Sequence, residues 1–117
     1  MGMYDDKVVL CGANSYNEKY YLNPDFEGLP DHVKEELKIM CVLYVHDVGG
    51  VLTLVFEENG ELCCEVTSED FDPTFDDIGS RLLIKKLQTE KSELLEALQM
   101  YFRVFFLNED MDLDGKE

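Results

Sequence analysis

The residues best suited to chemistry in this chain are three alternating aspartates, Asp110, Asp112 and Asp114, followed by Gly115. This D-x-D-x-D-G spacing matches the first half of a calcium-binding loop. A complete loop also needs a bidentate glutamate at its twelfth position, and the sequence ends at the eighth, Glu117. We therefore expect a solvated acidic tail here, with a weak calcium site at the three aspartates as the alternative.

A second group of carboxylates lies within residues 69–77, and its members are Glu69, Asp70, Asp72, Asp76 and Asp77. Carboxylate oxygens of this kind can hold magnesium. Acidic residues also favour the first turn of a helix, and Asp72-Pro73 is a typical helix start. We expect some of these side chains to cap a helix. The alternative is a small enzyme or a metal-dependent ligand binder that uses them.

The four cysteines do not form a metal-binding pattern. Cys11, Cys41, Cys63 and Cys64 lack the C-x-x-C spacing of zinc sites. Neighbouring strand residues point to opposite faces, so Cys63 and Cys64 are not expected to share a site. Cys11, Cys41 and Cys64 lie in apolar surroundings and are expected to be small core residues. No disulfide is predicted, because thiols stay reduced in the cytosol.

His32 and His46 are the remaining candidates for acid–base chemistry. His32 lies four residues before Glu36, a spacing typical of a pair on a helix surface. His46 follows Cys41 by five residues, about 500° around a helix, so the two do not share a face. The chain has no G-x-S-x-G elbow and no phosphate-binding glycine loop. No catalytic residue, cofactor-binding residue or cofactor is predicted, and a non-enzymatic role is favoured.

The net charge of this chain argues against nucleic-acid-binding and membrane-binding proteins. Its 117 residues carry 26 acidic and 10 basic side chains, a net charge of −16. Residues 39–80 carry 10 acidic side chains and no basic one. Phosphate backbones and anionic lipids repel such a chain, so nucleic acids and membranes are not expected as partners. The acidity is typical of a soluble protein; the alternatives are docking on a basic partner surface and mimicry of nucleic acid.

The elements that would position these residues are clearest between Val51 and Val66. Two strand-like runs flank Glu58-Asn59-Gly60, a strong hairpin signal. A two-residue turn would put a glutamate among large apolar groups, which is costly. A three-residue loop instead places Glu57 opposite Glu61 and needs Gly60 in the left-handed conformation. This register is predicted because it gathers six apolar side chains on one face: Leu52, Leu54, Phe56, Leu62, Cys64 and Val66.

Further elements complete an α+β pattern. Strands are predicted at residues 7–12 and 18–22, paired with each other, and a helix at residues 30–46. Residues 39–45 are apolar throughout, so a strand after a two-turn helix is the alternative there. The resulting ββαββα order predicts a four-stranded, mainly antiparallel sheet with helices on one face.

A long C-terminal helix is predicted because residues 74–107 contain no proline and a single glycine, Gly79. Asp72-Pro73 would begin it, with a capping box from Thr74 to Asp77. Unbroken, it would be ~50 Å long and would overhang a domain about 35 Å across. The overhanging end is apolar, so pairing with a second copy is predicted, and a bend near Gly79 or residues 88–92 is the alternative.

Three stretches carry a family resemblance. They are Tyr20-Tyr-Leu-Asn-Pro-Asp-Phe-Glu-Gly-Leu-Pro30, Asp47-Val-Gly-Gly-Val-Leu-Thr-Leu-Val-Phe56, and Asp77-Ile-Gly-Ser80 followed by Lys-Lys-Leu-Gln88. Over about residues 7–107 the chain resembles a small acidic family of unknown function from Gram-positive gut anaerobes. The resemblance implies a bacterial origin and a cytoplasmic location, and it implies no activity.

Together these features predict one α+β domain over residues 1–107 and an acidic tail over residues 108–117. The N-terminus lacks the apolar core of a secretory signal, and no apolar run approaches the ~20 residues of a membrane span, which favours the cytoplasm. The favoured function is a non-enzymatic protein-interaction domain that acts through a protein partner or as a homodimer.

Overall fold

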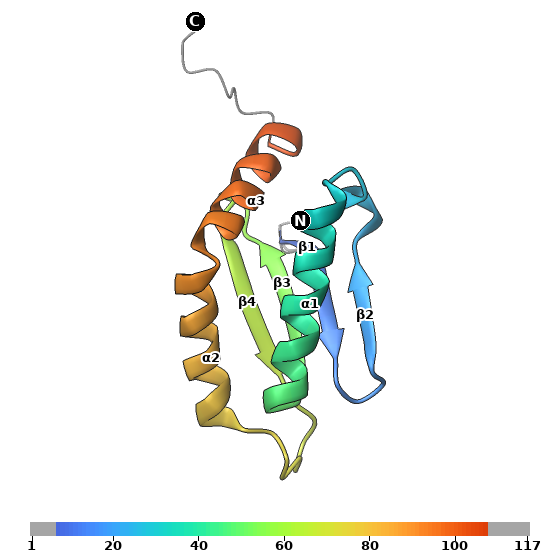
Figure 1. Ribbon diagram of the computed structural model, residues 1–117, viewed down its shortest axis with the longest axis vertical. Coiled ribbons are helices and arrows are strands. Elements are labelled where there is room, and N and C mark those ends of the chain that lie inside the picture. Colours follow the sequence, from blue (N-terminus) through green and yellow to red (C-terminus); the bar gives the residue numbers. More distant parts are fainter. Residues whose placement is uncertain (1–6, 108–117) are drawn as a thin grey trace, which may run out of the picture.

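The computed structural model describes residues 7–107, which form a four-stranded antiparallel sheet and three α-helices (Figure 1). The strands are β1 (Val8–Asn14), β2 (Lys19–Leu22), β3 (Val51–Phe56) and β4 (Leu62–Thr67). The helices are α1 (Asp31–Val48), α2 (Asp77–Glu90) and α3 (Ser92–Phe105), with a 3-10 turn at Pro24–Phe26. The α+β class and the antiparallel sheet are confirmed. The predicted ββαββα order is wrong at its C-terminal end, where two helices follow the second hairpin.

The sheet has the strand order β2-β1-β3-β4, so the first strand of the chain lies at its centre. The predicted pairing of the first two strands is confirmed, with Cys11 opposite Leu22. The predicted hairpin register is confirmed as well. Phe56 lies opposite Leu62, the Glu57 N–H donates to the Glu61 carbonyl oxygen at 2.8 Å, and Gly60 has a φ of 89°. The apolar pattern therefore selected the register.

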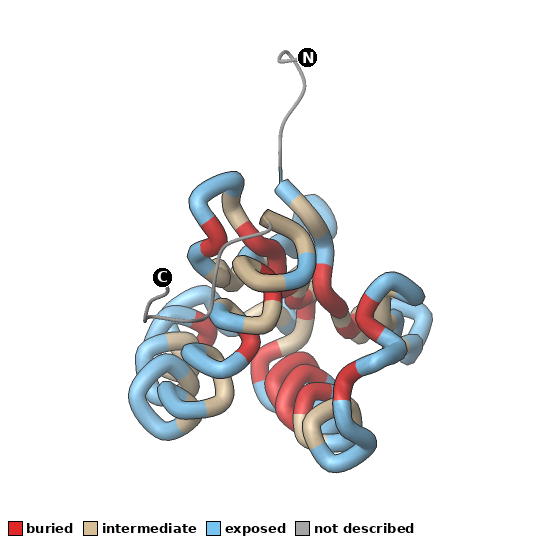
Figure 2. Tube along the Cα trace, turned by 90° about the horizontal axis from the view of Figure 1, so that it is seen from above, coloured by how far each residue is buried: buried red, intermediate tan, exposed pale blue. Residues whose placement is uncertain are grey.

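The core lies between one face of the sheet and the helices, which Figures 1 and 2 together place on the same side. From the sheet it receives Cys11, Leu52, Leu54 and Phe56, all fully buried, and from α1 it receives a stripe at helical spacing: Leu37, Met40, Cys41, Tyr44 and Val48. The predicted helix at residues 30–46 is confirmed and extends to Val48, so the strand alternative for residues 39–45 is wrong.

The single long C-terminal helix is a wrong prediction, because the segment breaks at Lys91, where φ is −109° and ψ is 22°. The break falls within residues 88–92, which the sequence offered as a place for a bend. The predicted helix start at Asp72-Pro73 is also wrong. α2 begins at Asp77, and the Asp76 carboxylate caps it by accepting from the Gly79 N–H at 2.8 Å. The Asp72 carboxylate caps its own turn by accepting from the Thr74 N–H at 2.9 Å.

After the break, α3 packs over the end of the β3–β4 hairpin. Leu98 and Phe102 are each 2% exposed, and the Phe102 ring stacks on Phe56 with centroids 4.2 Å apart. The Gln99 side-chain oxygen accepts from the Leu62 N–H at 2.8 Å. Part of the apolar surface expected to overhang is thus buried within the same chain, whereas Phe105 remains 66% exposed, and the dimer stays a prediction.

Candidate functional site

The carboxylates of residues 69–77 serve the local fold. The Asp72 carboxylate accepts hydrogen bonds from the Thr74 hydroxyl at 2.6 Å and from the Tyr16 hydroxyl at 2.5 Å. These bonds, that from Thr74 first, hold the Asp72 pKa below its usual value. Asp77 pairs with Arg81 at 2.8 Å. Within residues 7–107, no group of three His, Cys, Asp or Glu side chains is placed to hold a metal ion, so a metal-dependent role gains no support here.

The three aspartates of the half calcium loop, Asp110, Asp112 and Asp114, lie outside the described residues. The proposal of a weak calcium site at these positions therefore stays a prediction from the sequence.

The cysteines are placed as packing residues. Cys11 and Cys41 are fully buried, with their Sγ atoms 3.9 Å apart. The hydrogen bond between the Cys41 and Cys11 thiols, together with burial, raises the pKa of the Cys41 thiol. Burial raises the pKa of Cys64 to about 11, and it also raises that of Cys63. A thiolate is therefore disfavoured at Cys41, Cys63 and Cys64, and none of these three suits a nucleophile at neutral pH.

The two histidines lie on the surface of α1. The His46 side chain is 80% exposed, with its Nδ1 atom 3.7 Å from the Asp47 carboxylate. Cys41 is fully buried, so the pair expected to point apart does so. His32 lies at the other end of the helix, where it lines a groove between α1 and α2.

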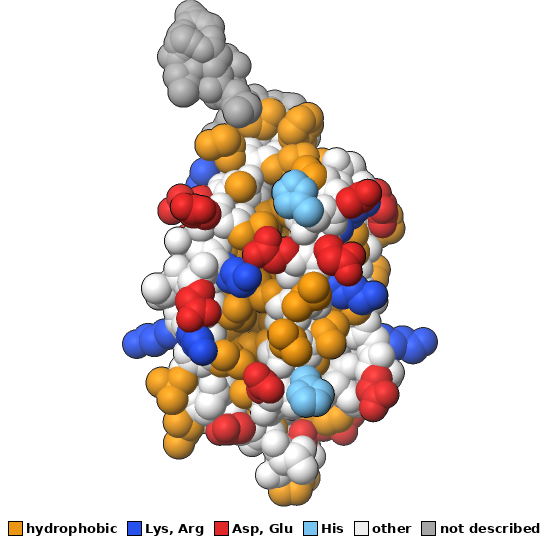
Figure 3. Space-filling model, viewed as in Figure 1, with side chains coloured by type: hydrophobic (Ala, Val, Ile, Leu, Met, Phe, Trp, Pro, Cys, Tyr) orange, Lys and Arg blue, Asp and Glu red, His pale blue; other side chains and the backbone are white. Residues whose placement is uncertain are grey.

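This groove is largely apolar and has a volume of about 510 Å³ (Figure 3). Its floor is formed by Met40 and Tyr44, which are buried, and by the half-buried Leu83 and Leu87. Ile39 and Leu43 rise beside the floor from α1. They are 50% and 56% exposed, which is high for large aliphatic side chains on one helix face.

Charged side chains surround the apolar surface of the groove, and they are mostly acidic: Glu35, Glu36, Asp47 and Glu90 against Lys86 and Lys91. The Lys91 ammonium contacts the Glu36 carboxylate at 2.9 Å and ties α1 to the break between α2 and α3. That pair neutralises itself, so three carboxylates and one ammonium remain at the rim.

A buried polar contact holds the two walls of the groove together at its other end. The Tyr44 hydroxyl of α1 bonds to the Ser80 hydroxyl of α2 and lies 3.3 Å from the Ser80 carbonyl oxygen. Ser80 is 4% exposed. α1 is thus joined to α2 at Ser80 and to the break after α2 at Lys91. These two contacts hold the walls of the groove in place.

The apolar run at residues 39–45 is the sequence feature that indicates this groove. Residues 39–45 are apolar all round, which is more than one buried helix face requires. Ile39 and Leu43 fall outside the stripe of α1 that packs in the core, and both are exposed in the groove. Surplus apolar residues on a helix that covers a sheet therefore indicated a second contact surface.

Comparison with known proteins gives a family and no activity. The model of a family of unknown function, DUF6145, matches residues 7–110. The resemblance to a family of unknown function is thereby confirmed over most of the chain. No curated protein and no solved structure matches the chain. Among the described residues, no helix is both long enough and apolar enough to cross a bilayer.

Proposed function

The chain belongs to DUF6145, a family of unknown function, and we propose that this member is a protein-interaction domain whose α1–α2 groove binds a helical segment of a partner. The observation that carries the proposal is the exposure of Ile39 and Leu43 beside a buried apolar floor. Side chains of this size gain about 1.5–3 kcal/mol each on full burial, so a partner that covers them is favoured. The proposed setting is the cytoplasm, as expected from the sequence.

The shape of the groove suits a helix. Its α1 wall runs from His32 to Asp47 at regular helical spacing, and its other wall is α2. At about 1.5 Å per residue, that wall is ~22 Å long, the length of a helix of about 15 residues. Recognition of an amphipathic helix in a groove uses apolar anchors at i, i+3, i+4 and i+7. Leu43 and Ile39, four residues apart, would meet such anchors.

The charge of the rim supports a basic partner helix. Three carboxylates and one ammonium outside the Lys91–Glu36 pair flank the apolar surface, in a chain with a net charge of −16. Lysine or arginine on the outer face of the bound helix would therefore be attracted, and acidic residues there would be repelled. A second copy of this acidic chain is a poorer match, which makes a homodimer the second candidate.

The test uses a fluorescent 15-residue peptide with leucines at helical spacing and lysines elsewhere, followed by anisotropy near physiological salt. Leu43→Lys is expected to weaken binding by about tenfold, or ~1.4 kcal/mol. Val42→Lys is the matched control, since Val42 is 39% exposed on the same helix and does not line the groove. Equal weakening by both variants would show charge attraction without a groove and would overturn the proposal.

Light scattering of the protein alone examines the homodimer. A mass near the 13.5 kDa of one chain leaves the groove for another protein. A doubled mass that Leu43→Lys returns to 13.5 kDa would assign the groove to a second copy.

A further inference from the structure

The outer edge of β4 is a second candidate binding surface, because main-chain groups of this strand point away from the sheet. β4 ends the sheet, since the strand order is β2-β1-β3-β4. The Glu57 N–H bonds to the Glu61 carbonyl, so bonded pairs alternate along the hairpin from that point. The pairs Leu54–Cys64 and Leu52–Val66 are then the non-bonded ones. The main-chain N–H and C=O groups of Cys64 and Val66 consequently point away from β3.

These edge groups lack the protection given to their neighbour. The Leu62 N–H points the same way, and it donates to the Gln99 side chain at 2.8 Å. No described residue outside the sheet bonds the main-chain groups of Cys64 or Val66. A regular strand edge with free donors and acceptors is a template for one more strand.

A groove of about 450 Å³ runs along this edge, so there is room for that strand. One wall is β4, through Cys64, Val66 and Thr67, and the other is α2, through Ser80, Arg81 and Ile84. An edge strand beside a helix is the arrangement in which extended peptides add to a sheet, held by main-chain bonds and by pockets for alternate side chains.

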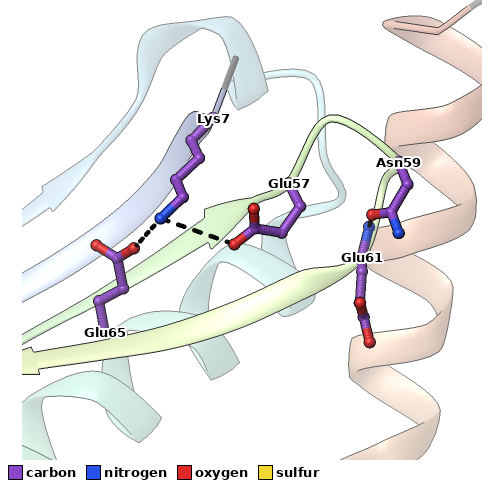
Figure 4. A network of polar contacts seen from close by, with 5 residues as sticks. All are labelled: Lys7, Glu57, Asn59, Glu61 and Glu65. Atoms are coloured by element: carbon purple, nitrogen blue, oxygen red, sulfur yellow. Dashed lines mark hydrogen bonds and ion pairs between the residues drawn. The ribbon is translucent and has the colours of Figure 1, made fainter. Parts of the chain in front are cut away.

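We propose that this edge binds an extended segment of another protein as a fifth strand, with apolar residues at alternate positions and basic residues between them. The apolar residues would pack against Val66 and Ile84 on the helix side. The intervening residues would lie beside Glu65 on the opposite face of the sheet. The Lys7 ammonium lies 2.8 Å from the Glu65 carboxylate and 3.8 Å from that of Glu57 (Figure 4). Two carboxylates thus share one ammonium, and a net negative charge remains beside β4.

Charge argues against an acidic peptide at this edge and against one register in which a second copy could pair here. Residues 39–80 contain 10 acidic side chains and no basic one, so an acidic peptide would be repelled. A second copy could pair its own β4 symmetrically, with Cys64 of each chain beside Val66 of the other. That pairing sets Glu65 directly opposite Glu65, and like charges directly opposite are destabilising.

The test uses a capped hexapeptide of alternating valine and lysine, with the full-length protein followed by NMR amide exchange. At saturating peptide, exchange of the Cys64 and Val66 amides is expected to slow by about tenfold or more. Methylation of single peptide nitrogens is expected to abolish binding at every second position and to be tolerated between them. A methylation pattern without this period of two, or unchanged exchange at both amides, would overturn the proposal.

Three variants separate this site from general charge attraction and from the α1–α2 groove. Glu65→Gln is expected to weaken the hexapeptide by several-fold, whereas Glu96→Gln, the same charge change at an exposed position of α3, is expected to leave it unchanged. Leu43→Lys is also expected to leave it unchanged. Loss of binding with Leu43→Lys would place the peptide in the other groove. Amide protection that rises with protein concentration alone would assign the edge to a second copy. Either result overturns the proposal.

Discussion

The Tyr44 hydroxyl and the Ser80 hydroxyl form a polar pair inside an otherwise apolar contact. Ser80 has no other side-chain bond among the described contacts, so it depends on Tyr44 to stay satisfied. A buried polar group that loses its partner keeps its full desolvation cost. The hydrogen bond between the two hydroxyls therefore helps to fix the distance between α1 and α2.

Tyr44→Phe is expected to lower the free energy of unfolding by about 1–3 kcal/mol, because the Ser80 hydroxyl is left without a partner. The Tyr44→Phe/Ser80→Ala double variant is expected to lose less than the sum of the two single variants, since both polar atoms are removed together. Urea denaturation of the four proteins measures the coupling. Strict additivity would show that the pair contributes no mutual stabilisation.

Asp72 links the β4–α2 connection to the turn after β1, through Tyr16. The pKa of Asp72 is lowered in the folded protein, so its contribution to stability is present above the unfolded pKa of about 3.9 and is lost as the pH falls through the folded value. We expect Asp72→Asn to lower the melting temperature near pH 6, with the difference from wild type closing at strongly acidic pH. Asp70→Asn, the same charge change two residues away, serves as the control. If the difference in melting temperature persisted at low pH, the ionised Asp72 carboxylate would not be the source of the stabilisation.

The aromatic side chains of α3 secure the helix to the hairpin at the level of whole elements. Phe102 stacks on both Phe56 and Phe106, and Phe26 completes the cluster. Phe102→Ala is expected to cost about 3–5 kcal/mol, the usual range for removing a buried phenyl ring. Phe105→Ala, on the same helix with a side chain 66% exposed, is expected to change stability by less than about 0.5 kcal/mol. Thermal and urea unfolding compare the two, and similar losses would contradict the observed packing of α3.

The hairpin and the break in the C-terminal helix show why some elements were predictable and others were not. Alternation along β3 and β4 allows one register to place all six apolar residues on the core face of the sheet, so the local pattern was sufficient. The break at Lys91 has no local signal, because residues 88–92 contain neither proline nor glycine. It coincides with a distant contact, the Lys91 ammonium against Glu36, and with the packing of Phe102 on Phe56. Contacts between elements outweighed helical propensity here.

The candidate site was harder to predict than the fold. The acidic clusters suggested a metal site because carboxylates can bind metals. Within residues 69–77, Asp72 and Asp76 instead cap a turn and a helix, and Asp77 pairs with Arg81. The groove depends on which faces of α1 and α2 remain uncovered after packing. The sequence alone does not show which helix faces stay exposed after packing. The surplus of apolar residues at 39–45 indicates only that α1 has a second apolar face.

For the whole molecule, the contribution of the acidic C-terminal residues can be measured directly. We expect a chain lacking residues 109–117 to melt within about 2 °C of the intact protein, because a solvated segment contributes little packing. Millimolar calcium is expected to affect both proteins equally. Stabilisation by calcium in the intact chain alone would instead support a site at Asp110, Asp112 and Asp114.

The central place of β1 in the sheet has a consequence for synthesis on the ribosome. β1 ends at Asn14, and its partner β3 begins only at Val51, after β2 and α1 have been made. At about 5–20 residues per second, β1 waits roughly 2–8 s for that partner. During this interval Leu10 and Cys11, which are fully buried in the folded protein, lack β3 beside them. We therefore expect ribosome-associated chaperones to contact β1 until β3 leaves the exit tunnel, and crosslinking of stalled nascent chains of increasing length would measure this contact.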